Sequence, residues 1–188
     1  MELIKSLREA SIIKNILLIV LGTILLAVSS KIKIPFWPVP MTMQTFVVLF
    51  IGISFGWKLG LSTVVLYLAE GIMGLPVFAG TPEKGSGMIY FTGPTMGYLI
   101  GFLSAVYLSG IFKFKNWLIN NSVKDFLSNF LKLILAVSTI YLLGVIWLSN
   151  FTGWEKVLAA GVKPFVLAEL FKILLLSFMI PIILKFKR

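Results

Sequence analysis

The sequence predicts an all-α, polytopic membrane protein that folds as a compact bundle of six transmembrane helices. Apolar residues make up 59% of its 188 residues and charged residues only 13%, whereas soluble domains average roughly 45–50% and 25%. Uncharged stretches also recur along the chain, and a spanning helix needs about 20 mostly apolar residues. A water-soluble globule could not cover its surface with this composition, so soluble enzymes are excluded.

Prolines, glycines and charges delimit the helices. Three prolines within residues 35–40 prevent a regular helix there. The Gly56–Lys58 turn separates the second helix from the third, and Gly74–Pro76 ends the third. A glycine-rich loop is expected over residues 78–90. The chain, 1–188, forms a single membrane domain with helices over residues 12–30, 42–56, 58–75, 93–112, 129–150 and 163–184.

Small residues recur at every fourth position of the fourth of these helices. With this spacing they form one smooth stripe along a helix, against which neighbouring backbones can pack closely. The stripe consists of Gly93, Gly97, Gly101, Ala105 and Ser109.

The net charge of +10 indicates topology rather than nucleic-acid binding, because the basic residues lie at the termini and between apolar runs instead of along one face. Six spans place both termini on the same side of the membrane. Eleven basic residues fall on that side and five on the other, so the positive-inside rule predicts cytoplasmic termini. We expect no cleaved signal peptide, because the first apolar run is too long for one.

The residue types that are missing limit the chemistry. Without histidine or cysteine, the chain lacks the usual ligands of zinc and iron–sulfur sites and the residues of a His- or Cys-dependent triad. The segment Gly80–Ser86 has the outline of a phosphate loop, but the residue directly before its serine is a glycine and not the lysine that the motif requires. We therefore expect no enzyme, no metal site, no cofactor and no ATPase in this chain.

Three ionisable residues, Glu70, Glu169 and Lys172, lie within the predicted spans. A charge near the bilayer centre costs at least about 2.5–3.5 kcal/mol on insertion scales, so each is a candidate functional group. Glu169 and Lys172 are three positions apart and share one helix face. They form either a buried salt bridge that fixes the helix or an acceptor and a donor for a ligand, and the sequence leaves both interpretations open.

Two more polar residues are expected at the same outer end of the bundle. Gln44 follows the proline segment, and Tyr67 lies three positions before Glu70 on a similar face. Aromatic residues at this level are usually part of an interfacial belt. Beside buried carboxylates, however, they also suit an apolar pocket with a few placed polar groups, which would form an outward-facing chamber.

Four segments occur in a distinctive order and spacing: Pro38–Thr45 (PVPMTMQT), Leu66–Gly71 (LYLAEG), Gly74–Ala79 (GLPVFA) and Gly93–Phe102 (GPTMGYLIGF). Together they resemble the BioY family, the biotin-binding S components of energy-coupling-factor (ECF) vitamin transporters, over roughly residues 15–184. The resemblance implies a six-helix bundle of the ECF S-component type in a prokaryotic cell membrane, with biotin as its ligand. It also implies two kinds of partner, a transmembrane T subunit and two ATPase subunits that hydrolyse ATP.

The resemblance also implies roles for the candidate residues. In the family, an acid and a lysine three residues later contact the ureido ring of biotin, and Glu169 and Lys172 keep that spacing. The usual acid is Asp, so Glu169 adds a methylene to the site. Gln44 is expected to help hold the ring, Glu70 to line the chamber and Tyr67 to supply an aromatic contact.

The loop over residues 78–90 is expected to act as a lid. Lys84 is its basic residue and the candidate partner of biotin's valerate carboxylate. Gly80, Gly85 and Gly87 supply the backbone freedom that closure needs, although the same glycines would also suit a plain mobile linker.

Docking on the T subunit is expected through small residues of the first helix, Thr23 and Ala27, which are four positions apart. S components of this kind are thought to topple in the bilayer and release the vitamin into the cytoplasm. Two alternatives remain open: an S component for another small vitamin such as riboflavin or thiamine, and a stand-alone biotin permease, acting alone or as a homo-oligomer.

Overall fold

The computed structural model of the chain describes residues 2–34, 41–83 and 85–186, with the side chains of residues 2–10 and 34 excepted. Four of its helical stretches are long and apolar enough to cross a membrane, and α4 is a shorter apolar helix. The elements are α1 (Glu2–Lys31), β1 (Lys33–Ile34), β2 (Met41–Thr42), α2 (Gln44–Ile72), α3 (Met88–Phe91), α4 (Met96–Ile111), α5 (Val123–Thr152), α6 (Trp154–Gly161), the 3-10 turn η1 (Lys163–Phe165) and α7 (Val166–Phe186).

Helix α2 consists of two arms joined at Gly56. The backbone of Gly56 is not helical (φ 77°, ψ 170°), a conformation that glycine adopts without strain. The end of α4 packs into this bend, since a Cβ atom on Gly110 would overlap the backbone of Trp57. The two arms are the second and third helices that the sequence predicts. With α1, α4, α5 and α7 they make the six-helix bundle, so the predicted fold class is confirmed.

The stripe of small residues lets α4 pack closely against two neighbours. Cβ atoms added to Gly97 or Gly101 would overlap Trp147 and Ile140 of α5. On the other side, Ser109 lies so close to Gly52 of α2 that this position has no room for a side chain. The backbones of α2 and α5 therefore approach α4 as the spacing predicts.

The structure differs from the predicted elements mainly at helix ends. Helix α5 begins at Val123 rather than near residue 129, because the Ser122 hydroxyl accepts a hydrogen bond from the Asp125 amide and caps the helix. Hydropathy locates only the part of a helix at lipid depth, so it misses such charged first turns. It also misses α3 and α6, which are too short to span a bilayer, and the β1–β2 ladder, in which Lys33 pairs with Thr42.

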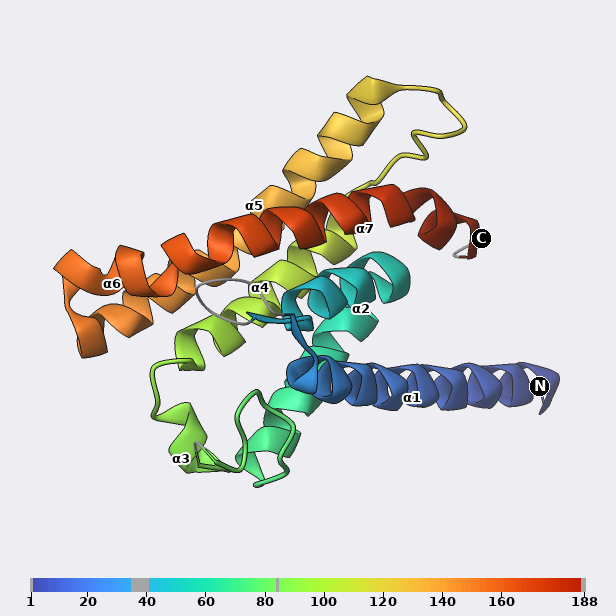
Figure 1. The fold of residues 1–188 in the computed structure, drawn as a ribbon. Coiled ribbons are helices and arrows are strands. Elements are labelled where there is room, and N and C mark those ends of the chain that lie inside the picture. The colour runs from blue at the N-terminus through green and yellow to red at the C-terminus, as the bar shows by residue number, and fades with distance from the viewer. Residues whose placement is uncertain (1, 35–40, 84, 187–188) are drawn as a thin grey trace.

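The bundle has two distinct ends (Figure 1). The N- and C-terminal ends of the chain lie at one end, and α3 and α6 lie toward the other. Helix α1 lies along the outside of the bundle, packed mainly against α2. Its outer face carries exposed apolar side chains, which suit contact with lipid: Ile13, Leu17, Leu21, Ile24 and Val28.

Candidate functional site

A cavity of about 390 Å³ lies toward the end of the bundle opposite the termini. This volume falls within the range of roughly 300–1,000 Å³ that is usual for small-molecule sites. The start of α2, the region leading into α4, the second half of α5, the α6–α7 junction and the start of α7 all contribute to it. Its polar lining consists of Thr42, Gln44, Thr45, Tyr90, Thr95, Tyr98, Tyr141, Glu169 and Lys172.

Glu169 and Lys172 form a buried ion pair on the cavity wall. The Lys172 ammonium donates to Glu169 Oε1 at 2.8 Å. Lys172 is 2% exposed and Glu169 is 5% exposed. Glu169 also lies in the first turn of α7, where the positive end of the helix dipole favours a carboxylate. The structure thus brings together the two charges that the sequence places on one helix face.

Thr45 joins this pair from the opposite helix, α2. Its hydroxyl lies 3.0 and 2.9 Å from the two carboxylate oxygens of Glu169 and accepts a hydrogen bond from Lys172 at 2.9 Å. A hydroxyl has one proton, so it donates to one carboxylate oxygen at a time. The sequence analysis missed Thr45 as a site residue, although it directly follows Gln44 in the PVPMTMQT segment.

Gln44 lines the cavity, whereas Tyr67 supports it from behind. The Gln44 amide donates to the Tyr67 hydroxyl at 2.6 Å, and that hydroxyl donates to the Val77 carbonyl at 2.9 Å. The Thr42 hydroxyl lies 3.4 Å from the Gln44 amide oxygen. This chain of hydrogen bonds links Gln44 to Tyr67, which lies behind the cavity wall, and the predicted contact of Tyr67 with a ligand stays a prediction.

Glu70 is not brought to the cavity in the described part of the chain. Glu70 is half-buried near the end of α2 and is not among the residues that line the cavity. Lys84 lies outside the described residues, so its predicted contact with a carboxylate stays a prediction.

The loop predicted as a lid is tied to the bundle near its start. Phe78 is buried, and its ring packs against those of Tyr67 and Tyr90 at centroid distances of 5.2 and 5.0 Å. The Lys31 ammonium donates to the carbonyls of Phe78 and Thr81 at 2.9 and 2.8 Å. These contacts hold Phe78 and Thr81 against the bundle.

Two residues of the predicted lid reach the cavity, Ala79 and Tyr90. The Tyr90 hydroxyl donates to the Ala79 carbonyl at 2.7 Å, and burial raises the pKa of Tyr90, so the phenol keeps this proton. The three predicted lid glycines have positive φ angles of 80°, 91° and 63°, which favour glycine: Gly80, Gly85 and Gly87.

Aromatic side chains that the sequence analysis did not select complete the wall. The Tyr98 hydroxyl donates to the Gly161 carbonyl at 2.9 Å, and its ring lies against Gly144, where a Cβ atom would overlap it. Tyr141 lies edge-on to Tyr98, with ring centroids 5.8 Å apart. Their convergence depends on how α4, α5 and α6 meet, which no local sequence pattern encodes.

The chemistry of this cavity is that of a binding site. It offers a carboxylate acceptor, an ammonium donor and an amide, set among apolar and aromatic walls. Within the described residues, no three His, Cys, Asp or Glu side chains come close enough to hold a metal ion. Comparison with known proteins identifies the class of binding protein.

The BioY family model matches residues 4–188. The chain belongs to the BioY family. This confirms the resemblance that four segments of the sequence indicate. Family members are transport subunits, and the chain is therefore not an enzyme.

Named relatives are similar to this chain in sequence, and one solved structure is similar to it in fold. The chain is 33% identical over 159 residues to "Probable biotin transporter BioY" of Pyrococcus horikoshii, covering 85% of this chain and 89% of the relative. It is 34% identical over 156 residues to "Biotin transporter BioY" of Thermotoga maritima, covering 80% and 84%. It also matches the crystal structure of "the S-component for biotin from an ECF-type ABC transporter" with a TM-score of 0.72 and 26% identity, covering 94% and 93% of the two chains.

The expected docking residues of this BioY chain face inward. Thr23 is 2% exposed, and its hydroxyl donates to the Val20 carbonyl within α1. Ala27 is half-buried and packs against the core. In this conformation neither residue offers a free surface to a T subunit, and their docking role stays a prediction.

Proposed function

We propose that this chain is the biotin-binding S component of an ECF transporter and that it holds biotin in the cavity around Glu169 and Lys172. The observation that carries the proposal is the buried ion pair on the cavity wall. Such a pair is costly to keep inside a membrane protein, and here it lies where a ligand can reach it. Membership of the BioY family supports biotin as that ligand.

Biotin's ureido ring matches the groups of the ion pair. Its two N–H groups are donors for the Glu169 carboxylate, and its carbonyl is an acceptor for the Lys172 ammonium. Both hydrogen bonds are charge-assisted and therefore stronger than neutral ones. The apolar part of the ring system would pack against cavity residues such as Leu99, Phe102 and Ile140.

Binding requires the ion pair to exchange partners. In the structure, Lys172 and Glu169 hydrogen-bond to each other and to Thr45. When the ureido ring enters, it replaces part of this mutual bonding with its own donors and acceptor. Thr45 keeps a hydrogen bond to the carboxylate throughout, so it holds Glu169, with its longer side chain, in position for the ring.

The other end of biotin carries a carboxylate that needs a cation. The valerate chain would extend toward the loop over residues 78–90, whose described residues Ala79 and Tyr90 already line the cavity. Lys84 belongs to this loop and is the proposed partner of the carboxylate. The loop segment beyond its Lys31 anchor would then close over the bound vitamin.

Delivery to the cytoplasm would use partner subunits. We propose a transmembrane T subunit and two ATPases, because the resemblance to S components of ECF transporters implies these partners. The predicted topology, with both termini cytoplasmic, places the cavity at the outer side of the membrane. Biotin would therefore enter from outside, and release would require the S component to reorient on the T subunit.

Equilibrium binding of radiolabelled biotin to the purified protein in detergent tests this function. We expect saturable binding that desthiobiotin displaces well, because desthiobiotin keeps both the ureido ring and the carboxylate. Biotin amide should compete worse if Lys84 binds the carboxylate, and equal competition would remove Lys84 from the site. Failure to bind biotin, or displacement by riboflavin or thiamine, would reject biotin as the substrate.

Uptake measurements test the need for partners separately. In cells that lack every ECF ATPase, we expect the expressed chain to bind biotin without accumulating it. Uptake that persists in such cells would favour a stand-alone permease, alone or as a homo-oligomer.

A further inference from the structure

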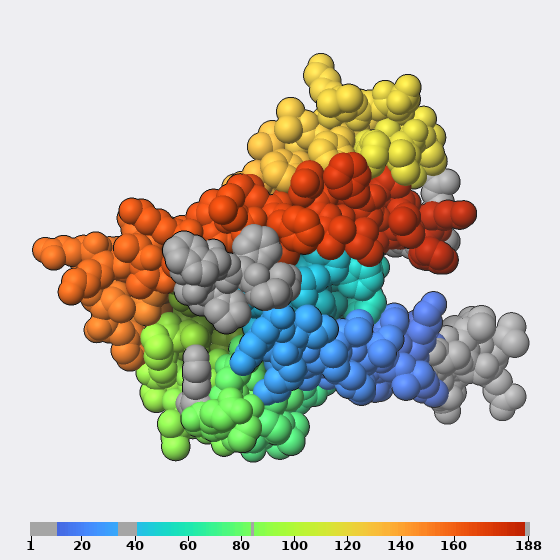
Figure 2. Space-filling model, in the orientation of Figure 1, coloured from blue at the N-terminus to red at the C-terminus, as the bar shows by residue number. Residues whose placement is uncertain are grey.

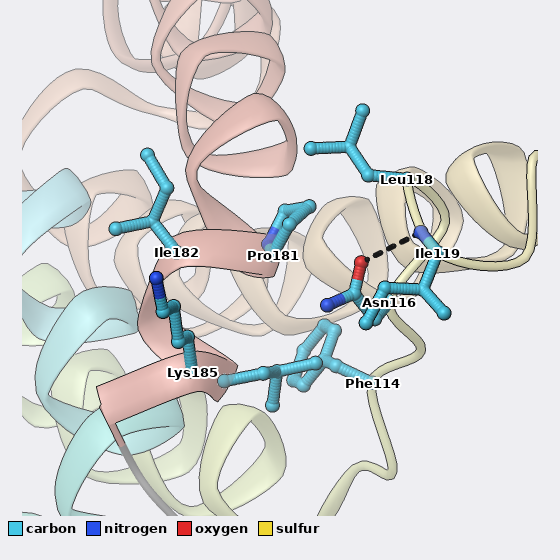
Figure 3. Close-up of a pocket in the computed structure, with 8 residues that line it drawn as sticks. Phe114, Asn116, Leu118, Ile119, Pro181, Ile182 and Lys185 are labelled. Carbon is cyan, nitrogen blue, oxygen red and sulfur yellow. Dashed lines mark hydrogen bonds between the residues drawn. The ribbon is translucent and has the colours of Figure 1, made fainter.

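A second, open cavity of about 750 Å³ lies at the end of the bundle that carries both termini. It is formed between the last turns of α7 and the loop over residues 112–122, which joins α4 to α5 (Figure 3). Most of its lining is apolar, and two polar side chains, Asn116 and Lys185, complete it. It shares no residue with the cavity around Glu169.

The loop is held in place by a hydrogen bond to a backbone carbonyl of α7 that a proline leaves without its helical partner. Pro181 lies inside α7 and has no N–H, so the Ser177 carbonyl four residues earlier loses its helical partner. The indole N–H of Trp117 donates to that carbonyl at 3.2 Å. The Trp117 ring also packs edge-on against Phe126 and Phe178, at centroid distances of 5.2 and 5.9 Å. The cavity therefore has fixed walls.

Two residues that carry hydrogen-bond donors line this cavity from different walls. The Asn116 side-chain oxygen accepts a hydrogen bond from the Ile119 amide at 3.2 Å, which leaves its NH₂ group directed into the space (Figure 3). The Lys185 ammonium comes from α7. In the part of the chain that the structure describes, neither nitrogen has a hydrogen-bond or ion-pair partner. Among the residues that the structure describes, no carboxylate side chain lines the cavity.

The surroundings of the cavity are positively charged. Residues 112–132 and 177–186 contain five lysines, and Asp125 is their only acid. Asp125 is already paired with Lys115 at 3.0 Å. The Lys132 ammonium lies 5.9 Å from the ring centroid of Phe114, a residue that lines the cavity. An anion is therefore attracted to this space.

The rim of the cavity is apolar and exposed. Ile119 is 72% exposed, and Leu118, Ile182 and Phe186 are also exposed. The loop lies directly beside the C-terminal part of α7 on the surface, yellow against red in Figure 2. A ligand that suits both the donors and this rim carries a negative charge and long apolar chains.

We propose that this cavity binds the headgroup of an anionic phospholipid from the leaflet on the side of the termini. The phosphate accepts hydrogen bonds from Lys185 and Asn116, and an acyl chain extends along Leu118 and Ile182. Clusters of basic residues at the membrane surface attract anionic lipids. The bound lipid fixes the depth of the α4–α5 loop in the bilayer, a property separate from biotin binding.

Native mass spectrometry of the purified protein in detergent tests this proposal. Phosphatidylglycerol and phosphatidylcholine with the same acyl chains are titrated against the wild type and the variants Lys185→Gln and Asn116→Ala. The control is Lys58→Gln, because Lys58 is an exposed lysine beside the same end of α4. Radiolabelled biotin binding shows in parallel that each variant is folded.

We expect the wild type to prefer phosphatidylglycerol and Lys185→Gln to weaken that binding about fivefold, as loss of one lysine near an anionic bilayer does. Asn116→Ala should weaken it less, Lys58→Gln should leave it unchanged, and inorganic phosphate should not displace the lipid. Equal binding of both lipids, equal losses in Lys58→Gln and Lys185→Gln, or displacement by phosphate would overturn the proposal. So would a Lys185→Gln variant that keeps its lipid but no longer co-purifies with a protein partner, since the surface would then be a protein interface.

Discussion

Two ion pairs of similar length lie in opposite environments in the described part of the chain. Lys172 and Glu169 are 2.8 Å apart and almost fully buried at the cavity end. Lys115 and Asp125 are 3.0 Å apart at the end that carries the termini, and the Lys115 side chain is 57% exposed. Distance therefore does not distinguish the two pairs, whereas burial does.

We propose that the exposed pair is a structural contact and that the buried pair belongs to a binding site. An exposed pair is screened by water and contributes little to stability. A buried pair carries a large desolvation penalty, and apolar residues of the same volume are often as stable or more so. The Lys172–Glu169 pair is therefore poorly explained as a device for stability alone, and its place on a cavity wall gives it a use. Substitutions in and around the two ion pairs test this difference.

The largest effect is expected from Lys172→Ala. It leaves the Glu169 carboxylate buried without its cation, so the free energy of unfolding should fall by about 3–5 kcal/mol, and biotin binding should weaken by more than about tenfold as a charge-assisted hydrogen bond is lost. Thermal unfolding in detergent and biotin titration measure the two losses.

A matched double variant, Glu169→Leu with Lys172→Met, separates the two roles of the pair. It removes both charges together, so we expect stability to return while biotin binding stays lost. A double variant that binds biotin like the wild type would refute the assignment of the site.

The next largest effect is expected from Thr45→Val. Valine keeps the shape of threonine but cannot hydrogen-bond to Glu169 or Lys172, so biotin binding should weaken by about tenfold, the worth of roughly one hydrogen bond. Thr45→Ser restores the hydroxyl and should restore most of the affinity. Equal binding by both variants would show that Thr45 does not position the carboxylate.

A smaller effect on binding is expected from Tyr67→Phe, which acts one layer behind the cavity. The change leaves the Gln44 amide and the Val77 carbonyl without their common partner, and stability should fall by about 1–3 kcal/mol. Biotin binding should weaken less than in Thr45→Val. The control is Tyr107→Phe, because Tyr107 is 41% exposed and should lose neither property.

No measurable effect on biotin is expected from Lys115→Gln. The variant removes the exposed ion pair and leaves the buried one intact, so the biotin Kd and the Tm should match those of the wild type. A loss of biotin affinity in this variant would show that burial does not separate the two pairs.

Local features of the sequence predict part of the candidate site, the two charged residues on the cavity wall. Glu169 and Lys172 stand out because charges are rare within apolar spans, and their spacing of three places them on one helix face. The sequence also predicts the turn at Gly56, because a glycine with a lysine two positions later interrupts an apolar run. Both signals are contained within a few consecutive residues.

The rest of the candidate site depends on tertiary structure. Thr45 reaches Glu169 across 124 positions of sequence, and Tyr98 reaches Gly161 across 63. Neutral hydroxyl side chains are common in membrane helices, so nothing local marks these two. Glu70 shows the reverse case, since it is conspicuous in the sequence yet lies away from the cavity wall.

Titration of biotin and 2-iminobiotin against the wild type and Lys172→Met tests the central claim most directly. In 2-iminobiotin a cationic donor replaces the ureido carbonyl, so it should be repelled by the Lys172 ammonium. We predict that the wild type strongly prefers biotin and that Lys172→Met loses most of this preference. Equal preference in the two proteins would contradict the claim that the buried ion pair recognises the ureido ring.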